Sequence, residues 1–261
     1  MKVKFFCLLA VLTIATSVWA EEWNRSFTVG SHPQLRVETS DASIAVTGAG
    51  GNTIAARVVA DGLHIGSDVA VKAEQNGDSV VLRVKIPDHH FVLNFRNRPV
   101  RVEVSVPRAT VLDLASSDGS VRVSGIAGET RLRTSDGSVQ VENFDGTLRA
   151  HTSDGSVKVM GRFDLLDLRT GDGSMRVEAQ NGSRMKGEWR LHTSDGSVVL
   201  RLPADFAADL DASTSDGHVD LQLPVEVTGR MDRTHVHGKL HGGGPSLEIH
   251  TSDGSITLQS L

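Results

Sequence analysis

Aromatic residues are scarce in this chain of 261 residues, where they make up 4% of the composition and tyrosine is absent. Of the three tryptophans, only Trp23 and Trp189 lie beyond an N-terminal leader segment. A basic surplus is also missing, because the formal net charge is −5, or −7 without the two lysines of the leader. Nucleic-acid binders usually combine a basic surface with exposed aromatic rings on which bases stack. We therefore expect no nucleic-acid partner and little capacity to hold sugars by ring stacking.

Cysteine is nearly absent, since Cys7 is the only one and lies within residues 1–20. That segment has two lysines near its start, an apolar stretch from Phe5 to Ala15, and an acceptable cleavage site at Val18-Trp19-Ala20, which is the pattern of a signal peptide. The position of Cys7 inside the apolar stretch does not fit a lipid-attachment cysteine. The mature chain then has no disulfide and must be held by packing alone. We predict an exported protein, periplasmic or extracellular, without a lipid anchor.

Long hydrophobic runs are also missing beyond the leader. No later stretch approaches the roughly 18 consecutive apolar residues of a membrane-spanning helix. We therefore expect no transmembrane segment after the leader is removed.

A Ser-Asp-Gly-Ser-Val motif recurs seven times with small variations, and a degenerate copy surrounds Asp41. The first four copies lie 18 residues apart, the next two follow after 23 and 21, and the last follows after 37, which predicts a diverged coil before the last copy. The paired aspartates and glycines are Asp118 and Gly119, Asp136 and Gly137, Asp154 and Gly155, Asp172 and Gly173, Asp195 and Gly196, Asp216 and Gly217, and Asp253 and Gly254.

Apolar residues alternate with polar ones on both sides of each motif. Around Asp118 they are Leu112 and Leu114 before the motif and Val121 and Val123 after it. A period of two predicts two short strands joined at the Asp-Gly corner. One such unit buries too little apolar surface to offset the entropy of ordering its backbone. The pattern therefore predicts an all-β protein, a parallel β-solenoid of roughly 18-residue coils stacked about 4.8 Å apart.

Residues 48–111 lack the motif but keep strand signals separated by turn residues. We predict three regions: a signal peptide at 1–20, an N-terminal β region at 21–111 that includes the degenerate copy, and the solenoid at 112–261. The N-terminal region is expected to form a β-sheet elaboration with hairpins, because the first edge of a solenoid needs a cover.

The repeated Thr-Ser-Asp-Gly-Ser-Val, together with Gly161-Arg162-Phe163-Asp164, Leu202-Pro203 and Leu240-His241-Gly242-Gly243-Gly244, resembles an exported bacterial family of putative adhesins with β-strand repeats. That family is a domain of unknown function. The chain is also similar to the putative auto-transporter adhesin head domain. The resemblance implies a right-handed parallel β-helix and an adhesin-like role, and it brings no catalytic residues with it.

The corner motifs are interpreted as structural. Glycine suits a left-handed backbone conformation, and the aspartate side chain can accept an amide hydrogen of the turn. The alternative is a ladder of bound cations, because carboxylates about 5 Å apart repel one another. Calcium-binding β-rolls, however, have a Gly-Gly-x-Gly-x-Asp turn that is missing here. His235, His237 and His241 could bind zinc, but they are more typical of an exposed strand and turn. We expect no metal and no cofactor.

Serine, histidine and aspartate are abundant, yet they recur in equivalent corners. A catalytic site needs one unique constellation with an oriented base, and no Gly-x-Ser-x-Gly elbow is present. We therefore predict that the protein is not an enzyme. A polysaccharide-active enzyme on a β-helix is the third alternative for its function.

Basic residues gather at outward positions beside the corners. The positions five residues before the aspartate hold Arg131, Arg149 and Arg190, those three before it hold Arg133, His151, Arg169 and His192, and those four after it hold Arg122, Lys158 and Arg176.

Two explanations stand for these columns of basic residues. They can balance the corner aspartates and keep the surface soluble, or they can match an anionic polymer such as an acidic envelope glycan or phosphorylated lipid headgroups. The candidate anion-binding residues are Arg131, Arg133, Arg149, His151, Arg169 and Arg190. We predict a non-enzymatic cell-envelope protein with an adhesin-like binding or structural role, whose partner is an anionic polymer or a protein. The alternative is a periplasmic accessory protein of an envelope-stress or assembly system.

Overall fold

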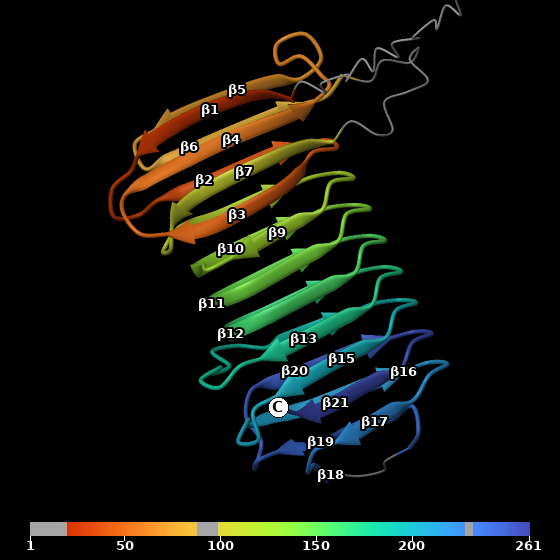
Figure 1. Cartoon of the computed structure of the whole chain (residues 1–261). Coiled ribbons are helices and arrows are strands. Elements are labelled where there is room, and N and C mark those ends of the chain that lie inside the picture. Colours follow the sequence, from red (N-terminus) through yellow and green to blue (C-terminus); the bar gives the residue numbers. More distant parts are fainter. Residues whose placement is uncertain (1–19, 88–98, 228–231) are drawn as a thin grey trace, which may run out of the picture.

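The computed structural model describes residues 20–87, 99–227 and 232–261, so the predicted signal peptide at 1–20 lies outside them except for Ala20. Within these residues there is no helix, and 21 strands join into one sheet (Figure 1). The predicted all-β class and the solenoid architecture are confirmed.

The strands, in chain order, are β1 (Ala20–Thr28), β2 (Gln34–Thr39), β3 (Ser43–Ala49), β4 (Thr53–Asp61), β5 (Ala70–Asn76), β6 (Ser79–Lys85), β7 (Val100–Pro107), β8 (Val111–Ala115), β9 (Val121–Ser124), β10 (Ala127–Arg133), β11 (Val139–His151), β12 (Val157–Arg169), β13 (Met175–Ala179), β14 (Trp189–His192), β15 (Val198–Leu202), β16 (Ala208–Thr214), β17 (Val219–Gln222), β18 (Glu226–Val227), β19 (His235–Leu240), β20 (Ser246–Thr251) and β21 (Ile256–Ser260).

Each central coil consists of one strand that leads into the Asp-Gly corner and one that leaves it. The coil at Asp118, for example, is formed by β8 and β9, and β8 pairs in parallel with β10 of the next coil. Leu112 and Leu114 before the corner and Val121 and Val123 after it are buried. The apolar positions of the alternating sequence pattern are therefore the ones that point inward on both sides of the corner.

The coils do not stack in the order of the sequence. The coil of β2 and β3 lies between that of β6 and β7 and that of β8 and β9. At the other end, the coil of β20 and β21 pairs with β14 and β15 on one side and with β16 and β17 on the other. The expected diverged coil before the last motif is wrong: this stretch instead supplies β18 and β19, and β19 runs antiparallel to β16 at the end of the stack.

Antiparallel strands also cover the N-terminal end. β5 pairs with β6, β4 pairs with β7, and β1 pairs with β4. Only β5 and β6 form an expected hairpin, because the other two pairs join strands that are not consecutive in the chain. The strand pairing runs without interruption from this region into β8 and β9.

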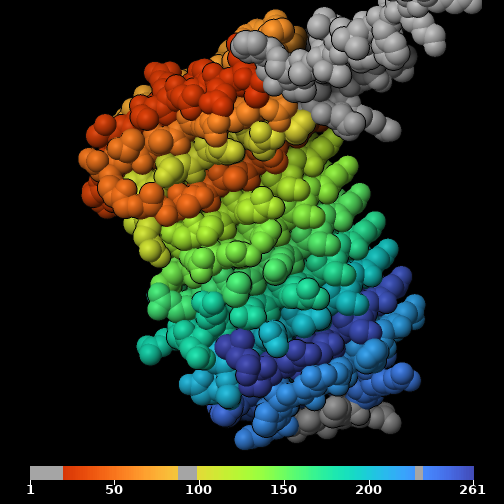
Figure 2. Space-filling model, in the orientation of Figure 1, coloured from red at the N-terminus to blue at the C-terminus, as the bar shows by residue number. Residues whose placement is uncertain are grey.

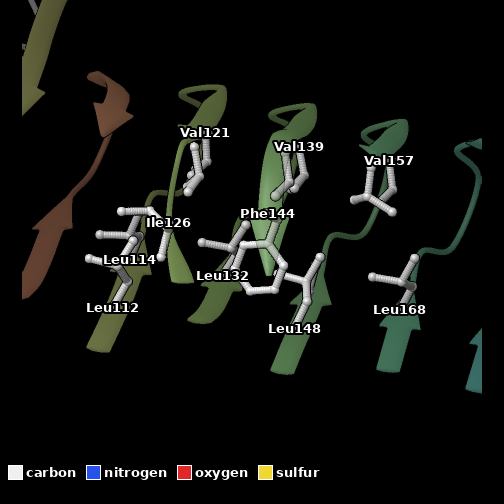
Figure 3. Close-up of a cluster of buried hydrophobic side chains, with 14 of the residues drawn as sticks. Leu112, Leu114, Val121, Ile126, Leu132, Val139, Phe144, Leu148, Val157 and Leu168 are labelled. Atoms are coloured by element: carbon white, nitrogen blue, oxygen red, sulfur yellow. The ribbon is translucent and has the colours of Figure 1, made fainter. Parts of the chain in front are cut away.

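The core is a continuous set of apolar layers enclosed by the two strands of each coil (Figure 3). Layers of leucine and valine such as Leu114, Leu132 and Val139 repeat from coil to coil with almost no exposure. Where the chain passes from one coil to the next, larger rings fill the space: Phe144 stacks on Phe163, with ring centroids 5.8 Å apart. The few aromatic rings of the repeats thus serve packing.

A buried hydroxyl organises each corner. Thr152 is fully buried, and its hydroxyl lies 2.9 Å from the carbonyl oxygen of Ser135 and 3.2 Å from that of Gly137, both in the preceding coil. The same oxygen accepts the amide hydrogen of Gly155 at 3.1 Å. The hydroxyl, and not the aspartate as expected, therefore closes the turn. Equivalent bonds are made by Ser116, Thr134, Thr170, Thr193, Thr214 and Thr251.

The corner glycines are required by close contact between coils. The expected left-handed conformation is wrong, because the positive-φ glycines do not include any of the seven corner positions. A Cβ atom on Gly137 would instead lie 2.2 Å from the carbonyl oxygen of Gly119 and 2.7 Å from the hydroxyl of Thr134. The stacked backbones leave no room for a side chain.

We predict that Gly137→Ala lowers the free energy of unfolding by about 2 kcal/mol or more, because the obstructing atoms belong to the backbone of the adjacent coil. Gly50→Ala is the matched control, since no atom lies within 4 Å of its added Cβ. Urea unfolding followed by circular dichroism measures both. Equal midpoints for the two variants would contradict the close-contact explanation.

We predict that the same substitution, threonine to valine, has different effects on stability at a corner position and at a position outside the corners. Thr152→Val removes a bonded hydroxyl and leaves the Gly155 amide buried without its acceptor, which should cost about 1 to 3 kcal/mol. Thr130→Val removes a buried hydroxyl that has no hydrogen-bond partner in the described structure, so it should be neutral or stabilising. Thr152→Ser should be more stable than Thr152→Val, because a serine hydroxyl makes the same bonds at the corner of Ser116. Thermal unfolding of the three variants tests this, and a stable Thr152→Val would refute it.

Candidate binding walls

Two outward surfaces flank the corners and are named here by their strands. Wall A is the outward side of the strands that lead into the corners, from β8 through β10, the second halves of β11 and β12, and β14 to β20 and β16. Wall B is the outward side of the strands that leave them, from β9 through the first halves of β11 and β12 to β13 and β15. Wall B faces the viewer in Figure 2, where the corners project along one edge.

The parallel register places the predicted arginines of wall A in straight rows. Arg131 stands beside Arg149, and the row continues through Asp167 to Arg190. In the adjacent row, Arg133 stands beside His151 and then Arg169. The next two members of that row are His192 and His250. Between Arg131 and Arg190 the first row thus has one acidic member, Asp167, and the second row has none.

Each of the five predicted arginines has a carboxylate partner. The nitrogen to oxygen distance is 2.7 Å for Arg133 with Asp113, 2.9 Å for Arg149 with Glu129 and 3.1 Å for Arg169 with Asp167. Arg131 shares Glu129 at 3.4 Å, and Arg190 pairs with Glu188 and also with Glu248 at 3.5 Å. All these side chains remain partly exposed, so each pair contributes at most about 1 kcal/mol.

One shallow hollow gathers most of the predicted residues. It has a volume of about 380 Å³, and its polar lining consists of Arg131, Arg133, Arg149, His151, Asp167 and Arg169. Two of its arginines share the single carboxylate of Glu129, so positive charge exceeds negative charge locally. Arg190 lies in a neighbouring hollow of about 300 Å³ with Arg169, His192, Glu248 and His250.

The pair of His192 and His250 was not among the predicted site residues. Their rings stack with centroids 5.0 Å apart and an interplanar angle of 14°. Burial, the neighbouring His250 and then Arg169 lower the pKa of His192. Both histidines lie three residues before a corner aspartate, so the signal was present in the motif. The contact between the two histidines could not be predicted without the stacking order of the coils, which brings β20 next to β14.

The corner aspartates form a row of exposed carboxylates. The pKa of Asp118 is raised, first by burial and then by the charges of Asp41 and Asp136 in the adjacent coils. No group of three histidine, cysteine or acidic side chains that could hold a metal occurs among residues 20–87, 99–227 and 232–261. Of the three clustered histidines, His235 pairs with Asp211 at 3.0 Å.

The stacked coils and their two outward walls define a β-solenoid with repeated surface rows. The chain belongs to the Toastrack DUF4097 family, whose model matches residues 33–259, and this confirms the resemblance drawn from the repeats. The family is a domain of unknown function. No curated protein matches the chain. No helix long and apolar enough to cross a membrane occurs in the described parts of the chain.

Solved structures with a similar fold include a putative cell adhesion protein from Clostridium sporogenes, with 10% identity, a TM-score of 0.40, and coverage of 92% of this chain and 100% of that one. A putative lipid binding protein from Parabacteroides distasonis has 12% identity, a TM-score of 0.45, and coverage of 91% and 96%. A putative adhesin from Bacteroides fragilis has 11% identity, a TM-score of 0.40, and coverage of 92% and 97%.

We predict that Asp118→Asn stabilises the protein at neutral pH. A raised carboxyl pKa in the folded state means that ionisation disfavours folding, so stability is lost as pH rises through the folded pKa. The gain should be under about 1 kcal/mol, because Asp118 is exposed to solvent. It should vanish below about pH 4, where aspartates are protonated.

Melting temperatures from pH 3 to 8 measure this effect. Asp205→Asn, at an exposed turn outside the aspartate row, is the control. A lower melting temperature for Asp118→Asn at pH 7 would show that the carboxylate is needed at the corner.

Proposed function

We propose that this protein is an exported, non-catalytic binding module of the cell envelope that recognises an anionic polymer. It acts in the periplasm or outside the cell as an adhesin-like β-solenoid, with the right-handed winding that its family resemblance implies. Repeated coils present the same groups at a fixed interval, so several weak contacts can act together on a repeating ligand.

The arginine-lined hollow of wall A carries this proposal. Arg131 and Arg149 are neighbours in adjacent strands, and both depend on Glu129 for charge balance. A carboxylate, sulfate or phosphate group entering the hollow would offset the excess charge, and the planar guanidinium groups offer bidentate hydrogen bonds to such groups.

Absence of catalysis is part of the same proposal. The hollows on wall A are shallow and formed by side chains that recur from coil to coil. Acid-base catalysis depends on one oriented group held within reach of a reacting atom. A rigid wall of repeated ion pairs supports binding along a length of polymer.

The test is salt-dependent binding to dextran sulfate, a soluble sulfated polysaccharide. The double variant Arg131→Gln and Arg149→Gln removes two positive charges from the hollow. Lys72→Gln with Arg184→Gln removes the same charge from exposed positions outside both walls. We expect the wall A variant to bind about tenfold more weakly than this control, which corresponds to about 1.4 kcal/mol.

Circular dichroism checks that both variants remain folded. If the two variants bind equally, the wall A arginines do not bind the polymer and serve only to balance charge. No binding of the wild-type protein at low salt would overturn the proposed function as a whole.

A further inference from the structure

Wall B carries a second row of basic side chains, at the fourth position after the corner aspartate. Arg122 on β9 stands in register with Gln140 on β11, which stands beside Lys158 on β12, followed by Arg176 on β13. The three basic side chains are exposed. With strands about 4.8 Å apart, the row from Arg122 to Arg176 spans roughly 14 Å along the solenoid.

These basic groups differ from those of wall A because carboxylates do not neutralise them. Lys158 and Arg176 have no ion pair or side-chain hydrogen bond among the described residues, although they stand directly side by side. Arg122 has only the side-chain oxygen of Gln140, at 3.2 Å. Like charges opposite one another in a sheet are unfavourable. An anion placed between Lys158 and Arg176 would relieve that repulsion.

A row of serines runs beside the basic row. Each serine lies two residues before Gln140 or before one of the three basic residues of the row, so both side chains point to the same outward face. All four serines are exposed, and none of their hydroxyl groups has a hydrogen-bond partner within the described structure. They are Ser120, Ser138, Ser156 and Ser174. Wall B therefore offers a free hydroxyl on each of four coils and a free cation on two adjacent ones.

We propose that these two rows form a binding face for a linear acidic polysaccharide, which lies across the strands along the solenoid axis. The cations bind its carboxylate or sulfate groups, and the serine hydroxyls bind its ring oxygens and hydroxyls. This inference rests on the proposed function for the class of ligand, and it adds a face that is independent of the wall A arginines.

The surface favours a soluble polymer over a membrane. Peripheral membrane binding usually combines basic residues with apolar side chains that insert between lipids. The exposed large hydrophobic side chains of the described residues are Val111 and Leu261, and neither lies on wall B. Apart from the half-buried Val199, which follows Arg176 in the row, the two rows present charge and hydroxyl groups, which match an acidic sugar chain.

The experiment uses the mature full-length protein and dextran sulfate. Lys158→Gln with Arg176→Gln removes two charges from wall B, and is compared with the Lys72→Gln and Arg184→Gln control and with the wall A variant. We expect binding about tenfold weaker than the control and less dependent on salt, because fewer counterions are displaced. Ser156→Ala with Ser174→Ala should weaken binding without changing the salt dependence.

If the wall B variant binds dextran sulfate as tightly as the control, the assignment of wall B as a binding face is wrong. The wall A variant tests the proposed function separately. Vesicles of phosphatidylglycerol and phosphatidylcholine provide the second ligand. If the wall B variant loses vesicle binding but keeps its affinity for dextran sulfate, the face is a membrane contact and the polysaccharide assignment is wrong. Circular dichroism of the variants excludes unfolding as the cause.

Discussion

The corner hydroxyl is the interaction on which the stack depends. One buried oxygen, as in Thr152, links a turn to two carbonyl oxygens of the preceding coil and accepts an amide hydrogen of its own turn. The glycine three residues later, Gly155 in this coil, lets the two backbones approach so closely that a Cβ atom would not fit between them. A coil shifted by one residue would bury polar side chains and lose both features. The corner therefore fixes the register of every strand that leads into or out of it.

Because the register is fixed, residues at equivalent positions of successive coils line up in rows. A side chain at a given offset from the corner meets the residue at the same offset in the next coil, whatever the sequence distance between them. On wall A this places Arg149 between Arg131 and Asp167, and carboxylates at other offsets pair with the arginines. On wall B the same rule places Lys158 beside Arg176 without an acid between them. The difference between the walls follows from which residues occupy equivalent offsets.

The sequence revealed the inward face, the corner and the coil length, because each is a local pattern repeated many times. Leu114, Val121 and their equivalents were identifiable as core residues from the alternation of apolar and polar positions alone. The stacking order was not predictable, because coils with the same pattern are interchangeable as neighbours. The partnership of His192 with His250 depends on that order. The conformation of the corner glycines was misjudged for a related reason: the constraint comes from an adjacent coil and not from the turn itself.

The placement of β20 and β21 has a consequence for how the molecule assembles. These strands follow β16 to β19 in the chain, yet they lie between the coils of β14–β15 and β16–β17. A chain that emerges from its N-terminal side cannot add this end of the stack one coil at a time. The coil of β16 and β17 has no parallel neighbour until β20 and β21 arrive. This end of the solenoid must close as one cooperative unit, so incompletely synthesised chains remain open there and accessible to chaperones and proteases.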